Sequence, residues 1–319
     1  MRKFKTVAVA LAAVIFWGTA AMAVSDRAVD YLLKTAPRPS GMGGAFTAVP
    51  GDPIGIFWNP SAAMMSDRLA ISGNHSLRHF PHGRKNLDQL DSDTTGITLP
   101  LSGDAIMGIG FTVPGEWGID HTDTNDVLPD KEKLRGRERR FCYADLHGTE
   151  QAGAEFVDSN WYRYDNTDNG SHYRQFDTGG GFSFFYETQN GMMYGAQVRG
   201  LSSIVKGNIN AVKKALSITF GAAYRADKNA ATLAAADLEL SWKHGFETRW
   251  FGGIERSFDR KGFLRVGSMN GMPTYGAGSR FGSLRLDYAV VKNLMPQITG
   301  NEDVKTFQDG HFLSYTLSL

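Results

Sequence analysis

From Lys214 to Leu319, the sequence consists of short segments in which apolar and polar residues alternate, and the last segment ends at the final residue. The segments 237–242, 283–288 and 313–319 show the alternation most clearly. Because successive side chains of a β-strand point to opposite faces, each segment predicts a strand with one apolar and one polar face. A soluble β-sandwich also alternates, but a regular succession of such strands up to the C-terminus is typical of a membrane barrel.

The first 23 residues have the pattern of a secretory signal peptide, with a basic start, an apolar stretch at 7–17, and the small residues Ala21 and Ala23. The apolar stretch is shorter than the ~20 residues of a membrane-spanning helix, and no later segment supplies one. Only helices and closed sheets satisfy every backbone hydrogen bond in lipid. We therefore expect residues 1–23 to be cleaved on export and 69–319 to form a barrel in a bacterial outer membrane. An exported soluble β protein is the alternative.

Composition and motifs argue against several other classes of protein. The 34 Lys and Arg residues nearly balance the 33 Asp and Glu residues, so nothing indicates a nucleic-acid partner. In a strand, His82 would lie on the face opposite to His75 and His79, so we expect no metal site. No G-x-S-x-G motif marks a nucleophilic serine, and the lone Cys142 cannot form an internal disulfide. We predict neither an enzyme nor a bound cofactor.

Further strands are predicted from the same alternation. Since bacterial barrels have even strand numbers, additional strands are expected between 139 and 173, for a total of about 12–14. The links 102–104 and 189–191 have residues typical of hairpin turns. The long, charged stretch 115–140 lacks alternation and is predicted to be a large surface loop. The predicted strands are 69–80, 94–101, 105–113, 180–188, 192–201, 215–225, 232–243, 249–258, 263–268, 280–290 and 311–319.

Residues 24–68 do not alternate and are expected to form a separate element before the barrel. They contain the motif GMGGAFTAVPGDPIGIFWNPS at 41–61, whose glycines permit sharp turns or close approach to another surface. A dinucleotide-binding site would require a strand before the glycines and a βαβ unit around them, and the sequence predicts neither.

This motif resembles the N-terminal signature of the FadL-like outer-membrane β-barrel family, and within it the PorV/PorQ-type branch, which carries a similar glycine pair, Asp-Pro and Asn-Pro. FGAAYRAD from Phe220, LAAADLELSW from Leu233 and YGAGSRFGSLRLDYAVV from Tyr275 resemble late barrel strands of that branch. The resemblance implies an all-β fold, namely a transmembrane antiparallel β-barrel of about 14 strands whose lumen is obstructed by a short N-terminal plug at 24–68. The terminal Leu319 departs from the aromatic residue that ends many such barrels.

Two groups of residues are candidates for the functional site. The plug motif is expected to pack against the wall or to lie near a ligand, and the inward-facing charges are expected to pair with one another and the plug, or to shape a permeation path. The plug-motif residues are Gly43, Gly44, Asp52, Phe57, Trp58, Asn59 and Pro60, and the lumen charges are Arg225, Asp237, Glu239, Arg285 and Asp287.

The resemblance implies two functions. In the FadL-like case, the barrel takes up hydrophobic or amphipathic small molecules passively across the outer membrane, with a ligand near the plug that leaves through a gap in the wall. In the PorV-like case, the barrel does not transport but serves a secretion-system protein partner in protein secretion or surface attachment. Outer-membrane lipid is a partner in both.

Overall fold

The computed structural model describes residues 36–65, 68–77, 92–101, 105–114, 117–121, 130–147, 150–165, 172–207, 216–226, 231–242, 246–298 and 305–319. The predicted signal peptide, the first part of the predicted plug segment, the predicted turn 102–104, and His79 and His82 lie outside these ranges.

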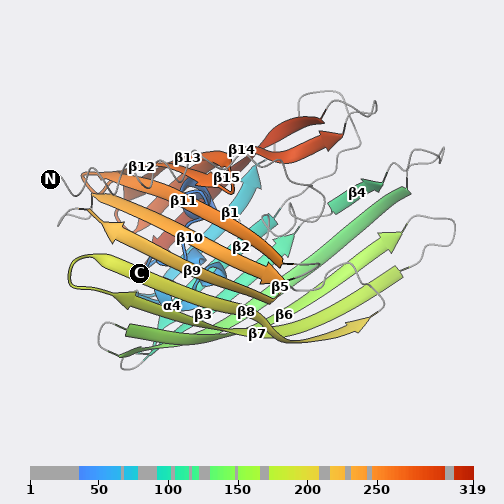
Figure 1. Cartoon of the computed structure of the whole chain (residues 1–319), viewed down its shortest axis with the longest axis horizontal. Helices are drawn as coiled ribbons and strands as arrows, with labels where there is room; N and C mark the ends of the chain where they lie inside the picture. The colour runs from blue at the N-terminus through green and yellow to red at the C-terminus, as the bar shows by residue number, and fades with distance from the viewer. Residues whose placement is uncertain are drawn as a thin grey trace.

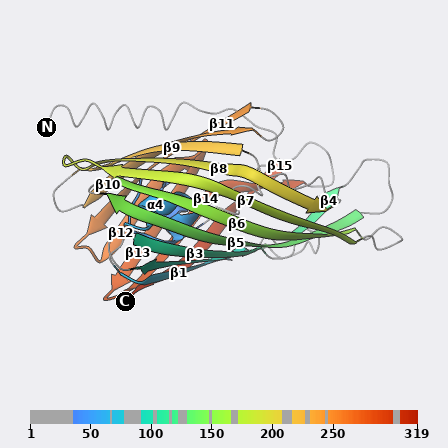
Figure 2. The ribbon, with the colours of Figure 1, turned by 90° about the horizontal axis from the view of Figure 1, so that it is seen from below.

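The described strands form one antiparallel sheet that closes on itself as a barrel (Figures 1 and 2). Closure follows from the pairing of β1 with both β2 and β15 and of β3 with β5. Strands β3 and β4 pair with successive parts of β5 and so share one position, which gives a barrel of 14 strands among the described residues. The strands are β1 Ala70–Leu77, β2 Ser92–Pro100, β3 Ala105–Pro114, β4 Trp117–His121, β5 Asp130–His147, β6 Glu150–Asp165, β7 His172–Glu187, β8 Met192–Gly207, β9 Leu216–Arg225, β10 Thr232–Trp242, β11 Phe246–Phe258, β12 Gly262–Met269, β13 Met272–Phe281, β14 Leu284–Ile298 and β15 Lys305–Ser318.

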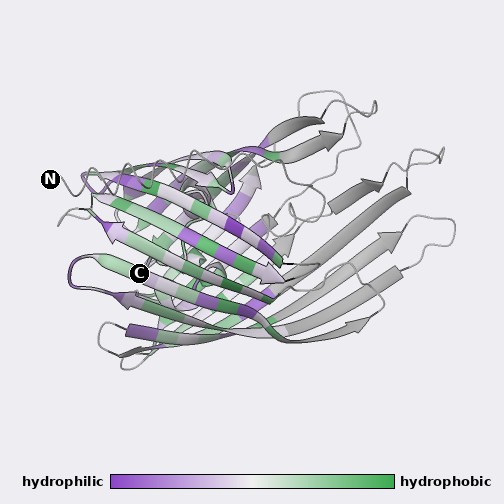
Figure 3. Cartoon of the chain, in the orientation of Figure 1, coloured by the Kyte–Doolittle hydropathy of each residue, from purple (hydrophilic) through white to green (hydrophobic). Residues whose placement is uncertain are grey.

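The barrel has an apolar outer face and a polar interior. In β10, the outward Leu238 and Trp242 are each 42% exposed, whereas the inward Asp237 and Glu239 are each 5% exposed. Figure 3 shows this alternation of hydrophobic and hydrophilic residues along the strands. A polar interior inside an apolar wall is the arrangement of a membrane-spanning barrel and the inverse of a soluble sandwich.

Helices account for little of the structure. Within the described ranges, no helix has the length and apolar character needed to cross a membrane.

The predicted strands are largely confirmed, with two corrections. The stretch 115–140, predicted as a surface loop, contributes β4 and the first part of β5. The prediction of one strand at 280–290 is wrong, because a turn at Gly282 and Ser283 separates β13 from β14. The extra strands expected between 139 and 173 are present as the end of β5, all of β6 and the start of β7.

The two ends of the barrel differ in their connections. The described links 188–191, 259–261 and 282–283 are all short and lie at one end, to the left in Figure 1, which we call the short-turn end. The predicted hairpin turn at 189–191 is confirmed there, and Gly191 supplies the positive φ of +77° that this turn requires.

Residues 36–65 lie inside the barrel, and we call them the inner segment (Figure 2). They contain α3 (Pro37–Gly41), the 3-10 helix η1 (Pro53–Phe57) and α4 (Pro60–Ala63), each beginning with a proline, whose fixed φ suits a first helical position. The carboxylate of Asp52 caps η1, and the side-chain oxygen of Asn59 caps α4. Helix α3 contacts β12 to β14, η1 contacts β1 to β3, and α4 contacts β5 to β7. The inner segment therefore spans the lumen from one wall to the other.

Candidate functional site

The inner segment approaches the barrel wall closely because the wall carries inward-facing glycines. A Cβ atom on Gly253 of β11 would clash with the backbone of Met42, and one on Gly195 of β8 would clash with the carbonyl of Thr47. On the inner segment, Gly43 has a φ of +65° and its missing Cβ leaves room for the backbone of β12. The backbones of plug motif and wall are thus in contact, with no space for side chains between them.

Hydrogen bonds from side chains fix the middle of the inner segment. Asp237 of β10, one of the predicted lumen charges, accepts hydrogen bonds from the backbone N–H groups of Phe46 and Thr47, both at 2.8 Å. Asn59 donates through its Nδ2 to the carbonyl of Thr47 at 2.7 Å and to that of Phe184 in β7 at 2.9 Å. A single amide therefore holds two parts of the inner segment together and attaches them to the wall.

The first turn of α4 makes a second polar contact with β7. The hydroxyl groups of Ser61 and Ser183 lie 2.7 Å apart, and the hydroxyl of Ser183 also accepts from the N–H of Ser61 at 3.2 Å. Pro60 precedes Ser61 as the first helical residue of α4 and is buried. The predicted Asn-Pro pair thus starts a helix whose N-terminal residues bond to the wall.

Arg38 connects the inner segment to a network of buried charges, which we call the arginine–carboxylate network (Arg38, Arg265, Arg285, Asp52, Glu255 and Asp287). Arg38 donates to Asp52 at 3.1 Å and to both oxygens of Glu255 in β11, at 2.9 and 3.0 Å. Glu255 also receives Arg265 at 2.6 Å and Arg285 at 3.4 Å.

Asp287 completes the network from β14. It pairs with Arg265 at 2.7 Å and with Arg285 at 2.8 Å. Three guanidinium groups therefore meet three carboxylates, so the network is neutral as a whole. Breaking one partner of a buried ion pair commonly costs about 3–5 kcal/mol, because the remaining charge stays buried without compensation.

A second charge cluster lies on the opposite wall. Glu155 of β6 accepts from Arg140 of β5 at 2.9 Å and from Arg199 of β8 at 3.2 Å. The guanidinium of Arg140 also lies 5.3 Å from the ring centroid of Phe57, within the range of a cation–π interaction. No local pattern in the sequence marks these three charged residues as a group.

The predicted lumen charges occupy the interior but do not form one site. Asp287 and Arg285 belong to the arginine–carboxylate network, whereas Glu239 pairs with Arg249 of β11 at 3.5 Å. Arg225 pairs with Glu187 at 2.5 Å near the short-turn end, where both side chains are partly exposed.

Apolar residues fill the remaining interior in two clusters. Phe57 and Trp58, the predicted aromatic pair, belong to the larger cluster, in which the rings of Trp58 and Phe46 pack edge to face with centroids 5.9 Å apart. We call the smaller one the methionine–phenylalanine cluster. It consists of Met269, Val291, Leu294 and Phe312, with Phe251 and Met272 packed against it.

The methionine–phenylalanine cluster adjoins the inner segment at Gly44. A Cβ atom on Gly44 would lie 2.8 Å from the ring of Phe251 and 3.4 Å from the methyl group of Met269. Gly44 itself has a φ of +82°, a conformation that favours glycine. The second glycine of the predicted pair therefore marks where the inner segment contacts an apolar surface.

Comparisons with known proteins give matches in structure but not in sequence. No protein-family model and no curated protein matches the chain. The Ralstonia pickettii toluene transporter TbuX is similar with a TM-score of 0.67 and 13% identity over 90% of this chain and 99% of that one. The P. putida toluene transporter TodX has a TM-score of 0.65 and 12% identity over the same shares.

A third similar structure is that of a Pseudomonas aeruginosa FadL homologue, with a TM-score of 0.59 and 12% identity over 89% of this chain and 98% of that one. At these identities the likeness shows a common fold. It agrees with the FadL-like barrel that the sequence motif resembles, while the assignment to the PorV/PorQ-type branch stays a prediction.

Proposed function

We propose that the protein is a bacterial outer-membrane channel for the passive uptake of hydrophobic or amphipathic small molecules. The observation that carries the proposal is the fold shared with two toluene transporters and a FadL homologue over about nine-tenths of the chain. The apolar exterior supports residence in lipid, and the signal-like N-terminus supports export. In this proposal the lipid of the outer membrane is the permanent partner of the barrel.

The inner segment acts as the plug in this proposal. In the structure its backbone contacts the wall at Gly195 and Gly253, so passage through the lumen requires the inner segment to shift. Beside the apolar packing of the larger cluster, its attachments to the wall include hydrogen bonds and ion pairs, such as those of Asn59 and Arg38. Water can replace such bonds when the plug moves, whereas it cannot replace apolar packing.

The methionine–phenylalanine cluster is the proposed contact surface for an apolar solute. It borders the inner segment at Gly44 and lies inside the wall formed by β11 to β15. Methionine side chains are flexible and polarisable and adapt to apolar partners of different shape. An apolar molecule can therefore replace contacts that Met269 and Met272 now make with their neighbours.

The proposed exit into the membrane lies next to the turn of the hairpin β12–β13, at the end of the barrel opposite to the short-turn end. Strand β12 has 8 residues, whereas β14 has 15. Pairing of β11 with β12 begins only at Phe251, and pairing of β14 with β13 ends at Val291. Beyond these two residues, the hairpin β12–β13 no longer fills the wall between β11 and β14. A tilted strand needs about 9–11 residues to cross the apolar layer. The methionine–phenylalanine cluster lies at this part of the wall.

A reversible lock on the inner segment tests the proposed function. The hydroxyl oxygens of Ser61 and Ser183 are 2.7 Å apart, so the pair Ser61→Cys and Ser183→Cys, made in a Cys142→Ala background, joins α4 to β7 on oxidation. In cells with an intact outer membrane, we expect the oxidised variant to take up a monoaromatic hydrocarbon as slowly as cells without the protein.

Reduction of the disulfide is the internal control and should restore uptake. The single variant Ser183→Cys should be insensitive to oxidant. Uptake that is equal in cells with and without the unlocked protein would contradict the proposal. A role as partner in protein secretion stays a prediction of the sequence resemblance, and co-purification with a large secretion protein would be its test.

A further inference from the structure

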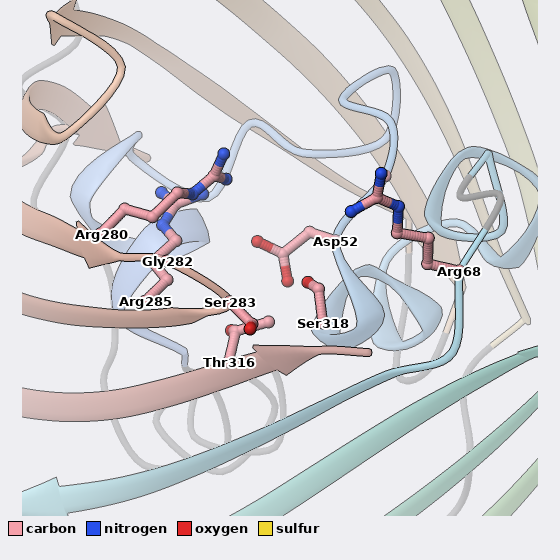
Figure 4. Close-up of a pocket in the computed structure, with 9 residues that line it drawn as sticks. Asp52, Arg68, Arg280, Gly282, Ser283, Arg285, Thr316 and Ser318 are labelled. Carbon is pink, nitrogen blue, oxygen red and sulfur yellow. The ribbon is translucent and has the colours of Figure 1, made fainter.

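A polar cavity of about 270 Å³ opens at the short-turn end of the barrel, between the inner segment and the turn from β13 to β14 (Figure 4). In Figure 4, Arg280 and Arg285 face Arg68 across the cavity, and Asp52 lies between them. The hydroxyl groups of Ser283 and Ser318 lie along one side. Liquid water occupies roughly 30 Å³ per molecule, so the cavity has room for a group much larger than water.

Asp52 does not neutralise Arg280 or Arg285, because its carboxylate already has partners in the inner segment. One oxygen pairs with Arg38 at 3.1 Å, and the other accepts the N–H of Ile54 at 3.2 Å. Arg285 pairs through its Nε with Asp287 and through its Nη2 with Glu255. Its third nitrogen, Nη1, has no hydrogen-bond partner among the described residues. One donor of Arg285 is therefore available to a ligand.

Arg280 brings a second guanidinium to the same place without a carboxylate. It is exposed, and within the ranges that the structure describes its side chain pairs with no acidic group. The ring of Phe263 positions it, since the guanidinium of Arg280 lies 5.7 Å and that of Arg285 4.4 Å from the ring centroid. Two like charges are thus held over one aromatic ring.

The local charge balance is consequently positive. The arginine–carboxylate network is neutral, and Arg280 adds a fourth guanidinium to its three carboxylates. Two guanidinium groups held together repel each other, and an anion between them converts this repulsion into charge-assisted hydrogen bonds. Arginine is also the side chain best suited to bind carboxylate and phosphate groups with two parallel bonds.

We propose that this cavity is a binding site for a small oxyanion, that is, a carboxylate or a phosphate group. Arg280 and Arg285 bind its oxygens from one side, Arg68 approaches from the other, and the hydroxyl groups of Ser283 and Ser318 donate the remaining hydrogen bonds. The site lies at the mouth of the lumen, where a free anion, the acidic group of a solute or a lipid headgroup can supply the same chemistry. The inference does not depend on the proposed transport.

Calorimetric titration of the purified full-length barrel in a maltoside detergent tests the site, with inorganic phosphate and acetate as probes. We expect saturable binding of at least one probe, and about tenfold weaker binding after Arg280→Gln because one charge-assisted contact is lost. Lys261→Gln is the matched control. Lys261 carries the same charge at the same end of the barrel but does not line the cavity, so its loss should leave the affinity unchanged.

Two results would overturn the inference: no saturable binding of either probe, or equal weakening by Lys261→Gln and Arg280→Gln. The heat-dependent gel mobility of each variant verifies that it is folded. Competition of the bound probe by a short-chain phosphatidylglycerol would identify a lipid headgroup as one source of the anion. Binding that this lipid leaves unchanged would assign the site to a free anion or a solute.

Discussion

Glu255 is the residue on which three arginines converge. It is 6% exposed and binds Arg38 from the inner segment together with Arg265 and Arg285 from the wall. Its charge therefore compensates buried cations that have few other partners, and it attaches the inner segment to β11 through Arg38. At the scale of single residues, the interior depends on such multiply shared charges and on glycines that permit backbone contact.

Glu255→Gln tests the shared charge. The substitution keeps the shape but removes the negative charge, so we expect the free energy of unfolding to fall by about 3–5 kcal/mol. Urea denaturation in detergent, followed by tryptophan fluorescence, measures it. Glu187→Gln removes the same charge from the partly exposed pair with Arg225 and should cost about 1 kcal/mol or less. Similar losses in both variants would refute a special role for Glu255.

Gly253→Ala tests the close contact between the inner segment and the wall. The added Cβ clashes with the backbone of Met42, so we expect the inner segment to be displaced, with a loss of about 1–3 kcal/mol in stability and higher conductance in planar bilayers. Gly179→Ala is the control, because a Cβ there meets no atom within 4 Å. If Gly253→Ala conducts no better than Gly179→Ala, the contact does not seal the lumen.

At the scale of elements, the hairpin β12–β13 is the feature that distinguishes one part of the wall from the rest. Its turn at Asn270 and Gly271 lies directly after Met269, a member of the methionine–phenylalanine cluster. The flanking strands β11 and β14 continue beyond it without a partner on that side. The methionine–phenylalanine cluster therefore borders the end of this hairpin.

Lengthening this hairpin tests the proposed exit. Two alternating residues added on each side of the turn at Asn270 should extend the wall and slow the uptake of an apolar solute, with no effect on folding. The same insertion at Asn190, in the turn at the short-turn end, should leave uptake unchanged. Uptake that is insensitive to the insertion at Asn270 would place the exit elsewhere.

At the scale of the whole molecule, the barrel closes by pairing of its first strand, β1, with its last strand, β15. The final part of β15 pairs with β1 along the whole length of β1, from Ala70 opposite Ser318 to Leu77 opposite His311. Over this range the edges of both strands are paired, as the apolar membrane interior requires. The C-terminal strand β15 is thus needed to complete the barrel, because it pairs with both β1 and β14.

Gel mobility and membrane fractionation test this closure. The folded barrel should sediment with the outer membrane and migrate differently with and without boiling, because a closed sheet resists detergent until it is heated. A variant truncated before residue 305 lacks β15 and should lose both properties. Recovery of the full-length protein as a soluble periplasmic species with no mobility shift would contradict the membrane barrel.

The strand alternation was readable from the sequence because a period of two is a local property of the extended backbone. It identified β10 and the end of β15, and glycine and proline marked the inner segment and the turn at Gly191. The alternation failed in β5, where residues 130–140 carry charges at successive positions, and in β13, where Gly276 and Gly278 interrupt the row of side chains on one face.

The sequence by itself determined the membrane barrel, the polarity of its two faces and the motif that lies inside it. Only the tertiary structure decided which charges meet. Arg38 and Glu255 are 217 residues apart in the sequence, and Glu155 pairs with arginines from β5 and β8. The reason is physical: such pairs depend on the register of every intervening strand and on the closure of the barrel, and neither is encoded in a local pattern.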